Sequence, residues 1–174
     1  NVTLTKLGTG TLTLSGANNK YITTIIAEGV LKLGSANALG GSATGSVVTV
    51  NSGATLDLNG IVSSLANPRD IWINGVGVGG LGALINSSAT GSSLVNSRLH
   101  LGSNSLISAI AGNITFSGYS IASSGYDLTL AGTAMGILTN TQINLGAGTL
   151  IKKGSGTWDI NGGNSTSTGL TNIL

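Results

Sequence analysis

The chain of 174 residues contains no cysteine, one proline (Pro68), and only two Trp, three Tyr and one Phe. Without cysteine, neither disulfides nor thiolate metal sites can form, so stability has to come from packing and backbone hydrogen bonds. No apolar run approaches the roughly 18 residues that a membrane-spanning helix needs. The sequence therefore predicts no membrane insertion by this segment.

Charge is also scarce. Seven Lys and Arg residues stand against five Asp and Glu, which gives a formal net charge of +2. The cations are spread along the chain, and only Lys152 and Lys153 are adjacent. A nucleic-acid-binding surface needs clustered cations, so the sequence predicts no nucleic-acid partner.

Glycine is abundant, with 29 residues, and Asn, Ser and Thr fill much of the rest. Between these residues lie short segments of alternating apolar and polar residues, such as 12–14, 56–58 and 128–130. Alternation of this kind is typical of half-buried strands, and Gly and Asn are the residues that tight turns favour. No segment keeps a helical apolar period over three turns, which indicates an all-β fold.

The apolar segments recur at a regular spacing and sort into three columns. The first column holds Leu12, Leu33, Leu56, Val78, Leu99, Ile121 and Ile143. The second holds Val62, Leu84, Leu106, Leu128 and Leu150, and the third holds Ile26, Val48, Ile71, Leu94, Ile114, Ile137 and Trp158. Three strands and about 22 residues per turn predict a right-handed parallel β-helix, a β-solenoid whose stacked coils share one aliphatic core.

A longer repeat lies over this period. The segment 4–18 returns at 150–164 without an insertion or deletion. Neither a linker nor a second domain separates the two copies. We expect residues 1–174 to form a single solenoid segment, part of a longer repetitive chain.

The first thirty residues carry an ordered motif: Gly8–Asn18, then a Tyr- and Thr-rich strand over 21–26, then Glu28–Leu33. This stretch resembles the autotransporter-associated β-strand repeat, and Gly154–Asn164 is a second, weaker copy in which Trp158 replaces Leu12. The resemblance implies an exported bacterial passenger domain, on the cell surface or released outside the cell. The family motif is structural and brings no catalytic residues.

Catalytic chemistry is not indicated. The five acids are Glu28, Asp57, Asp70, Asp127 and Asp159. On the column count Asp57 lies on the first face, Asp127 on the second, and Asp70 and Asp159 on the third, about four coils apart, so no two of them meet. The single histidine, His100, lies between two inward leucines, so we expect it to be exposed and inert, without partners for a zinc site. The glycine-rich segment 75–82 lacks the following helix that a phosphate-binding loop requires. The sequence predicts no enzyme, cofactor or metal.

Four residues are candidates for surface contacts. Trp72 falls on the outward phase beside Arg69, and Tyr119 and Tyr126 form a second exposed aromatic pair. The leading hypothesis is a structural rod, a stalk or fibre segment that self-associates head to tail or laterally through unpaired strand edges. The alternative is an adhesin that recognises a glycan or cell surface along one face. An enzyme ranks third.

Overall fold

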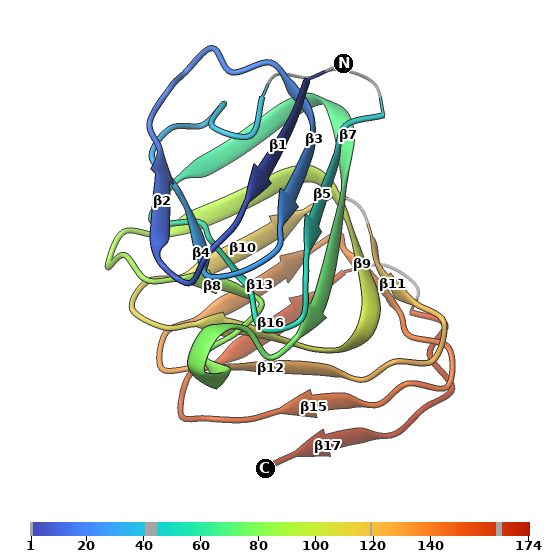
Figure 1. Ribbon diagram of the computed structural model, residues 1–174. Coiled ribbons are helices and arrows are strands. Elements are labelled where there is room, and N and C mark those ends of the chain that lie inside the picture. Colours follow the sequence, from blue (N-terminus) through green and yellow to red (C-terminus); the bar gives the residue numbers. More distant parts are fainter. Residues whose placement is uncertain (1, 41–44, 119, 163–164) are drawn as a thin grey trace.

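A computed structural model describes residues 2–40, 45–118, 120–162 and 165–174. Its strands belong to one 17-stranded sheet in which the pairings are parallel. The coils stack in chain order from the N-terminal to the C-terminal end (Figure 1). The predicted right-handed parallel β-helix is confirmed, and the coils between residues 47 and 161 have three strands each. Among the described residues, no helix is long and apolar enough to cross a membrane.

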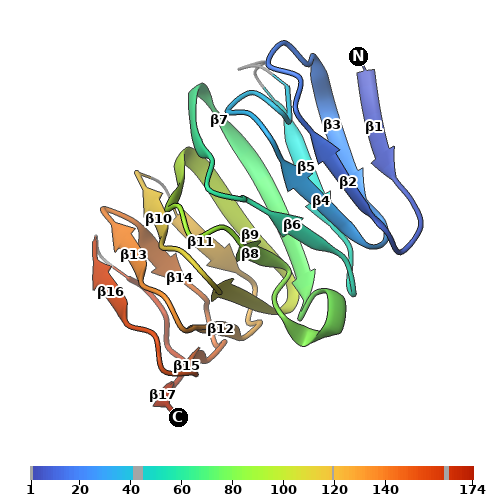
Figure 2. The same ribbon diagram turned by 90° about the vertical axis from the view of Figure 1, so that its left-hand side faces the viewer.

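Three ladders of strands make up the three sides of the coil, here called faces A, B and C (Figure 2). Face A consists of β1 (Val2–Lys6), β3 (Tyr21–Ile26), β5 (Val47–Val50), the second half of β7 (Val62–Gly75), the middle of β9 (Ser92–Ala109), β11 (Ser120–Ser123) and β14 (Gln142–Asn144). The long strands β7 and β9 each continue around a corner from one face to the next.

Faces B and C complete the coil. Face B consists of β2 (Thr11–Leu14), β4 (Val30–Leu33), β6 (Thr55–Asp57), β8 (Leu84–Asn86), the end of β9, β12 (Leu128–Gly132), β15 (Leu150–Lys152) and β17 (Thr171–Ile173). Face C consists of the starts of β7 and β9, then β10 (Ile114–Ser117), β13 (Gly136–Thr139) and β16 (Trp158–Asn161). The 3-10 turn η1 (Val78–Gly80) lies between faces A and B.

The interior is a set of stacked aliphatic columns, one or two per face. Each strand turns alternate residues inward, so residues in register on successive coils become neighbours. On face B the inward column runs Leu31, Leu56, Leu84, Ile107 and Leu130, and every member is buried. Columns of this kind explain the scarcity of aromatic residues, because aliphatic side chains fill a narrow core.

The position of Trp158 shows how the core adapts. Trp158 pairs with Gly136 on the preceding coil of face C. A side chain at position 136 would collide with the indole ring, whereas glycine leaves room for it. The indole Nε1 donates to the carbonyl of Ala131 at 3.1 Å. The substitution of leucine by tryptophan in the second motif copy is therefore matched by a glycine one coil earlier.

On faces A and C, the coils of the C-terminal half keep a constant step of 22 residues, whereas on face B the step varies between 21 and 23. Leu99 pairs with Ile121, and Ile121 pairs with Ile143, at equal steps along the chain. Hydrogen bonds between these coils span the same interval: the N–H of Leu145 donates to Ser167 Oγ, 22 residues further on. This part of the molecule follows the period that the sequence predicts.

Earlier coils are less uniform than the predicted columns assume. Leu12 pairs with Leu31, over a shorter stretch of chain than in the C-terminal half. Ile71 pairs with Leu99 over a longer stretch, which is called the long coil below. The long coil holds the loop over residues 75–82 with its 3-10 turn. The number of residues in a coil therefore changes along the rod, although the pairing of strands does not.

The assignment of columns to faces was therefore wrong. The first column begins on face B with Leu12 and ends on face A with Ile143. The third column begins on face A with Ile26 and ends on face C with Trp158. A column built on a constant step drifts from one face to the next wherever a coil is shorter or longer than that step.

The corner between faces A and B requires close contact of one coil with the next. At Gly29, φ is +65° and a Cβ would lie 2.6 Å from the carbonyl oxygen of Gly8. At Gly53, the corresponding corner one coil later, φ is +81° but no atom lies within 4 Å of a Cβ. The two glycines share a left-handed backbone and differ in contact with the neighbouring coil.

Alanine substitutions at Gly29 and Gly53 distinguish the free-energy cost of backbone strain from the cost of disturbing the contact between coils. We expect Gly53→Ala to lower the free energy of unfolding by about 1–2 kcal/mol, the cost of a left-handed alanine. We expect Gly29→Ala to lower it by roughly a further 1–3 kcal/mol, because the corner has to open to admit a methyl group. Urea denaturation followed by circular dichroism measures both. Equal losses for the two variants would contradict close stacking at this corner.

Candidate binding surface

The outward side of face A carries two parallel rows of side chains. One row runs Thr23, Val47, Asp70 and Arg98 in register. The second runs Ile25, Thr49, Trp72, His100, Ala122 and Asn144. The long coil places Asp70 beside Arg98 and Trp72 beside His100. These four residues, Asp70, Trp72, Arg98 and His100, are called the Trp72 patch below.

Two rings stack at the centre of the Trp72 patch. The ring centroids of Trp72 and His100 are 4.5 Å apart and the rings are inclined by 17°. This separation is close to the spacing of adjacent strands, so each ring stands on its own strand and covers one face of the other. Trp72 remains 41% exposed. The sequence prediction of an exposed tryptophan on this strand is confirmed.

Asp70 holds the imidazole in place. His100 Nε2 lies 3.0 Å from Asp70 Oδ1, and Arg98 Nε lies 3.5 Å from the same oxygen. One carboxylate thus contacts two cationic or polar groups from the next coil. The sequence predicts an exposed, inert histidine, but the side chain of His100 is only 24% exposed and contacts the carboxylate of Asp70. The constant step of the predicted columns had put Asp70 and His100 on different faces.

Arg69 is not a surface residue, which corrects the prediction that it lies beside Trp72 as a contact. Its exposed fraction is 2%. Its guanidinium donates to the carbonyl of Leu39 at 2.9 Å and to that of Gly40 at 2.8 Å, one coil of chain away from its own strand. Burial lowers the pKa of Arg69 to about 10, so the group stays charged at neutral pH. Arg69 is an internal clamp on the backbone at Leu39 and Gly40.

Of the two tyrosines predicted as surface contacts, the structure describes Tyr126. Tyr119 lies outside the described residues. Tyr126 is 41% exposed and lies in the turn before β12, where its backbone N–H donates to Ser123 Oγ at 3.1 Å. This turn is at the corner between faces A and B and not on the outward rows of face A.

Of the remaining acids, Asp57 and Asp127 bond to backbone N–H groups, and Asp159 lies on a different face from Asp70. Asp57 is buried and accepts hydrogen bonds from the backbone N–H groups of Asn59 and Ser87 at 3.0 and 3.1 Å. Asp127 accepts from the N–H of Thr149 at 2.7 Å, linking two coils. Asp159 is on face C and Asp70 on face A, so they do not share a face as the column count had it. Among the described residues, no group of three or more His, Asp or Glu side chains could hold a metal ion.

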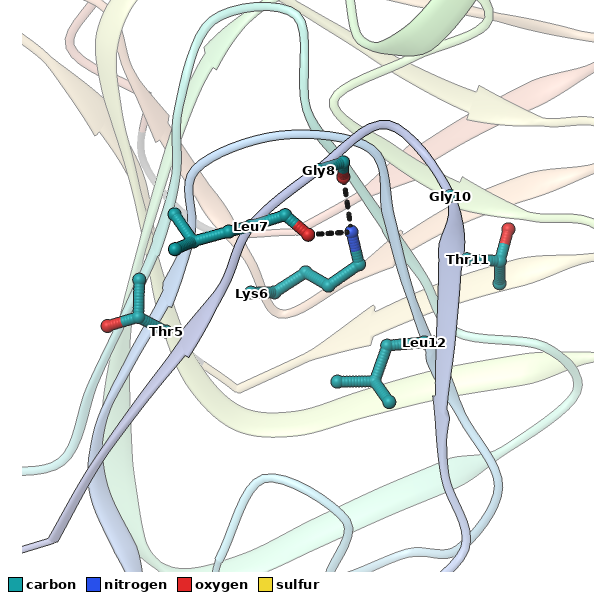
Figure 3. Close-up of a pocket in the computed structure, with 7 residues that line it drawn as sticks. All are labelled: Thr5, Lys6, Leu7, Gly8, Gly10, Thr11 and Leu12. Atoms are coloured by element: carbon teal, nitrogen blue, oxygen red, sulfur yellow. Dashed lines mark hydrogen bonds between the residues drawn. The ribbon is translucent and has the colours of Figure 1, made fainter.

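The repeated motif forms two corners of similar local geometry, the first copy between faces A and B and the second copy between faces B and C. In the first copy, Lys6 Nζ donates to the carbonyls of Leu7 at 3.0 Å and Gly8 at 2.6 Å (Figure 3). In the second copy, Lys152 Nζ donates to those of Lys153 at 2.9 Å and Gly154 at 2.6 Å. Residues 163 and 164 at the end of this copy lie outside the described residues.

The two lysines also occupy inward positions. Lys6 is in register with Ile26 on face A, and Lys152 with Leu130 on face B. Lys6 reaches a third acceptor, the carbonyl of Glu28 on the next coil, at 3.1 Å. The aliphatic stem can cover the end of the apolar column while the ammonium group bonds to the corner. The open hollow beside the first corner is lined by residues 5–8 and 10–12 and has a volume of about 400 Å³.

Comparisons of the chain with protein-family models, with curated proteins and with solved structures find no match.

The clamp formed by Arg69 is testable against a surface arginine. Replacing a buried cation that bonds two carbonyls leaves both oxygens without those donors, so we expect Arg69→Met to lower the free energy of unfolding by about 1.5–3 kcal/mol. Arg98→Met removes an arginine that is 41% exposed, and its effect should stay below about 1 kcal/mol. Urea denaturation measures the free energy of unfolding of both variants. A loss as small for Arg69→Met as for Arg98→Met would contradict the clamp.

Proposed function

We propose that this chain is a non-catalytic structural rod, part of an exported surface or fibre-forming protein of a bacterium. The observation that carries the proposal is the continuous ladder that joins the described strands into one parallel sheet around an aliphatic core. Each coil rests on its neighbours, which makes a solenoid stiff and quasi-one-dimensional. A rod of this kind serves as a stalk or spacer.

The absence of catalysis is part of the same proposal. A carboxylate pair for acid and base chemistry has to share one site. The described acids are instead distributed over separate places: Asp57 bonds to backbone amides, Asp70 to His100, and Asp127 to the next coil. Each of these carboxylates has a structural contact that accounts for its position.

Export to the bacterial cell surface follows from the resemblance of the first thirty residues to the autotransporter-associated repeat. The lack of cysteine is compatible with an oxidising environment, in which free thiols would be at risk of oxidation. Stability that comes from ladders and corners does not depend on the redox state of the surroundings. These points support an extracellular location for the segment.

Self-association through strand edges belongs to the proposal as well. Among the described strands, β1 pairs with β3 alone and β2 with β4 alone. The carbonyls of Gly10 and Leu14 accept from Val30 and Gly34 on the next coil. Because alternate residues of a strand point their N–H and C=O groups to opposite sides, the intervening residues such as Thr13 offer theirs to the free side. An edge of this kind pairs with a further strand, from the preceding coil of a longer chain or from a second copy of this segment.

A second function, a binding module for a glycan or cell surface, is favoured by one observation. Trp72 is held half-exposed on a flat face, beside the charged side chains of Asp70 and Arg98. A half-exposed tryptophan with polar neighbours is typical of recognition surfaces. The rod and the binding module are compatible, since a stalk can carry a binding face.

The assembly is tested by electron microscopy of the purified chain over a concentration series. We expect rods of uniform width that lengthen with concentration. Thr13→Pro removes one edge N–H that faces the free side and leaves the ladder to β4 in place, so it should shorten the rods. Thr13→Val keeps the N–H and should assemble like the parent chain.

Compact globular particles would contradict the rod itself. Discrete short rods at every concentration, unchanged by Thr13→Pro, would contradict head-to-tail assembly and leave a monomeric stalk. Circular dichroism of both Thr13 variants checks that the β-sheet signal is retained.

A further inference from the structure

We propose that the Trp72 patch is a binding site for a neutral saccharide, with the indole ring as its stacking surface. The inference rests on the binding role given above as the second function, and it names the ligand class and the residues. The carrying observation is the stack of Trp72 and His100, fixed by Asp70 and bordered by Arg98, on the outward side of face A.

The stacking surface is rigid before any ligand binds. His100 covers one face of Trp72 with ring centroids 4.5 Å apart, and Asp70 holds His100 through Nε2 at 3.0 Å. All three side chains stand on strands that are paired on both sides within the sheet. A pre-organised ring loses little conformational entropy on binding.

Asp70 and Arg98, which border the stacked rings, can form hydrogen bonds with hydroxyl groups of a ligand. A sugar hydroxyl is both a donor and an acceptor. The carboxylate of Asp70 accepts hydrogen bonds, the guanidinium of Arg98 donates them, and both side chains are partly exposed, at 29% and 41%. The C–H face of a pyranose can pack on the exposed indole while its hydroxyl groups reach these side chains. An apolar partner would leave both charges without a hydrogen-bonding partner in the ligand.

The balance of charge favours a neutral ligand. Asp70 and Arg98 form an ion pair with Nε to Oδ1 at 3.5 Å, so the patch presents one carboxylate and one guanidinium side by side. An acidic sugar would meet the carboxylate, and a cationic ligand would meet the guanidinium. Neither class gains from the pair as a whole.

The row leaves room for a ring next to the stack. The residue that follows His100 in the row is Ala122, and Asn144 comes after it. Two strand spacings separate His100 from Asn144, roughly 9.6 Å, and only a methyl group stands between them. A further unit of an extended chain, beyond the one packed on the indole, can therefore lie over Ala122 beside the imidazole.

The experiment titrates the purified chain with a soluble cello-oligosaccharide and a chito-oligosaccharide, using oligogalacturonate as the acidic comparison. Isothermal titration calorimetry measures affinity, and tryptophan fluorescence reports on the patch. We expect saturable binding of at least one neutral oligosaccharide with a change in fluorescence, and little response to about 0.5 M sodium chloride, which screens ionic contacts.

Trp72→Ala should weaken this binding by at least about tenfold and remove the fluorescence response, since only Trp158 then remains. The matched control is Tyr126→Ala, which removes an aromatic ring of the same 41% exposure at a different corner and should leave affinity unchanged. Ala122→Leu fills the space beside His100 and should weaken oligosaccharides more than single sugars.

Three results would overturn the proposal: no saturable binding of either neutral oligosaccharide, unchanged affinity in Trp72→Ala, or binding of oligogalacturonate alone that salt abolishes. Electron microscopy and thermal unfolding of the same samples keep the two proposals apart. Intact rods that bind no neutral saccharide would refute the site and leave the rod, whereas particles without rod shape would refute the rod whatever they bind.

Discussion

No strand of this protein pairs with another strand of its own coil in the described ladders. A strand inside the stack finds its partners on the coil before and the coil after, and a strand at either end of the stack on one neighbouring coil. A single coil can therefore satisfy neither its backbone hydrogen bonds nor its apolar side chains, and both needs are met only by stacking. This constraint explains the close corners, where Gly29 lies against the backbone of Gly8. It also explains why polar side chains such as Asp57 and Arg69 bond across coils.

The fold could be predicted because the sequence shows two periods, one within a strand and one from coil to coil. Alternation gives the strand, and a recurrence of about 22 residues gives the coil. The assignment of residues to faces could not be predicted, because it depends on the length of each coil. The loop from Gly75 to Gly82 lengthens one coil, and every residue beyond it moves relative to a fixed count. Nothing in an alternating pattern marks how far a loop shifts the register.

The Trp72 patch illustrates this limit. The exposure of Trp72 could be predicted, because its strand alternates clearly between two inward isoleucines. Its partner His100 and the acid Asp70 could not be joined to it by a constant step, since their pairing requires the long coil. Arg69 was misplaced for a different reason: a charged residue next to a proline suggests a surface turn, but its guanidinium finds two carbonyls inside.

The direction of the hydrogen bonds determines how the solenoid responds to a pull along its axis. In a parallel solenoid the ladders run along the axis of the rod, so a pull on its two ends loads those bonds in tension. The weakest coil yields first, and the coils beyond its immediate neighbours keep all their bonds because each coil contacts only the coils next to it. A coil of about 22 residues drawn straight releases roughly 70 Å of chain, many times the roughly 4.8 Å it occupied in the stack. Such a rod resists bending and compression as a solid, yet under tension it can lengthen one coil at a time and dissipate a sudden load.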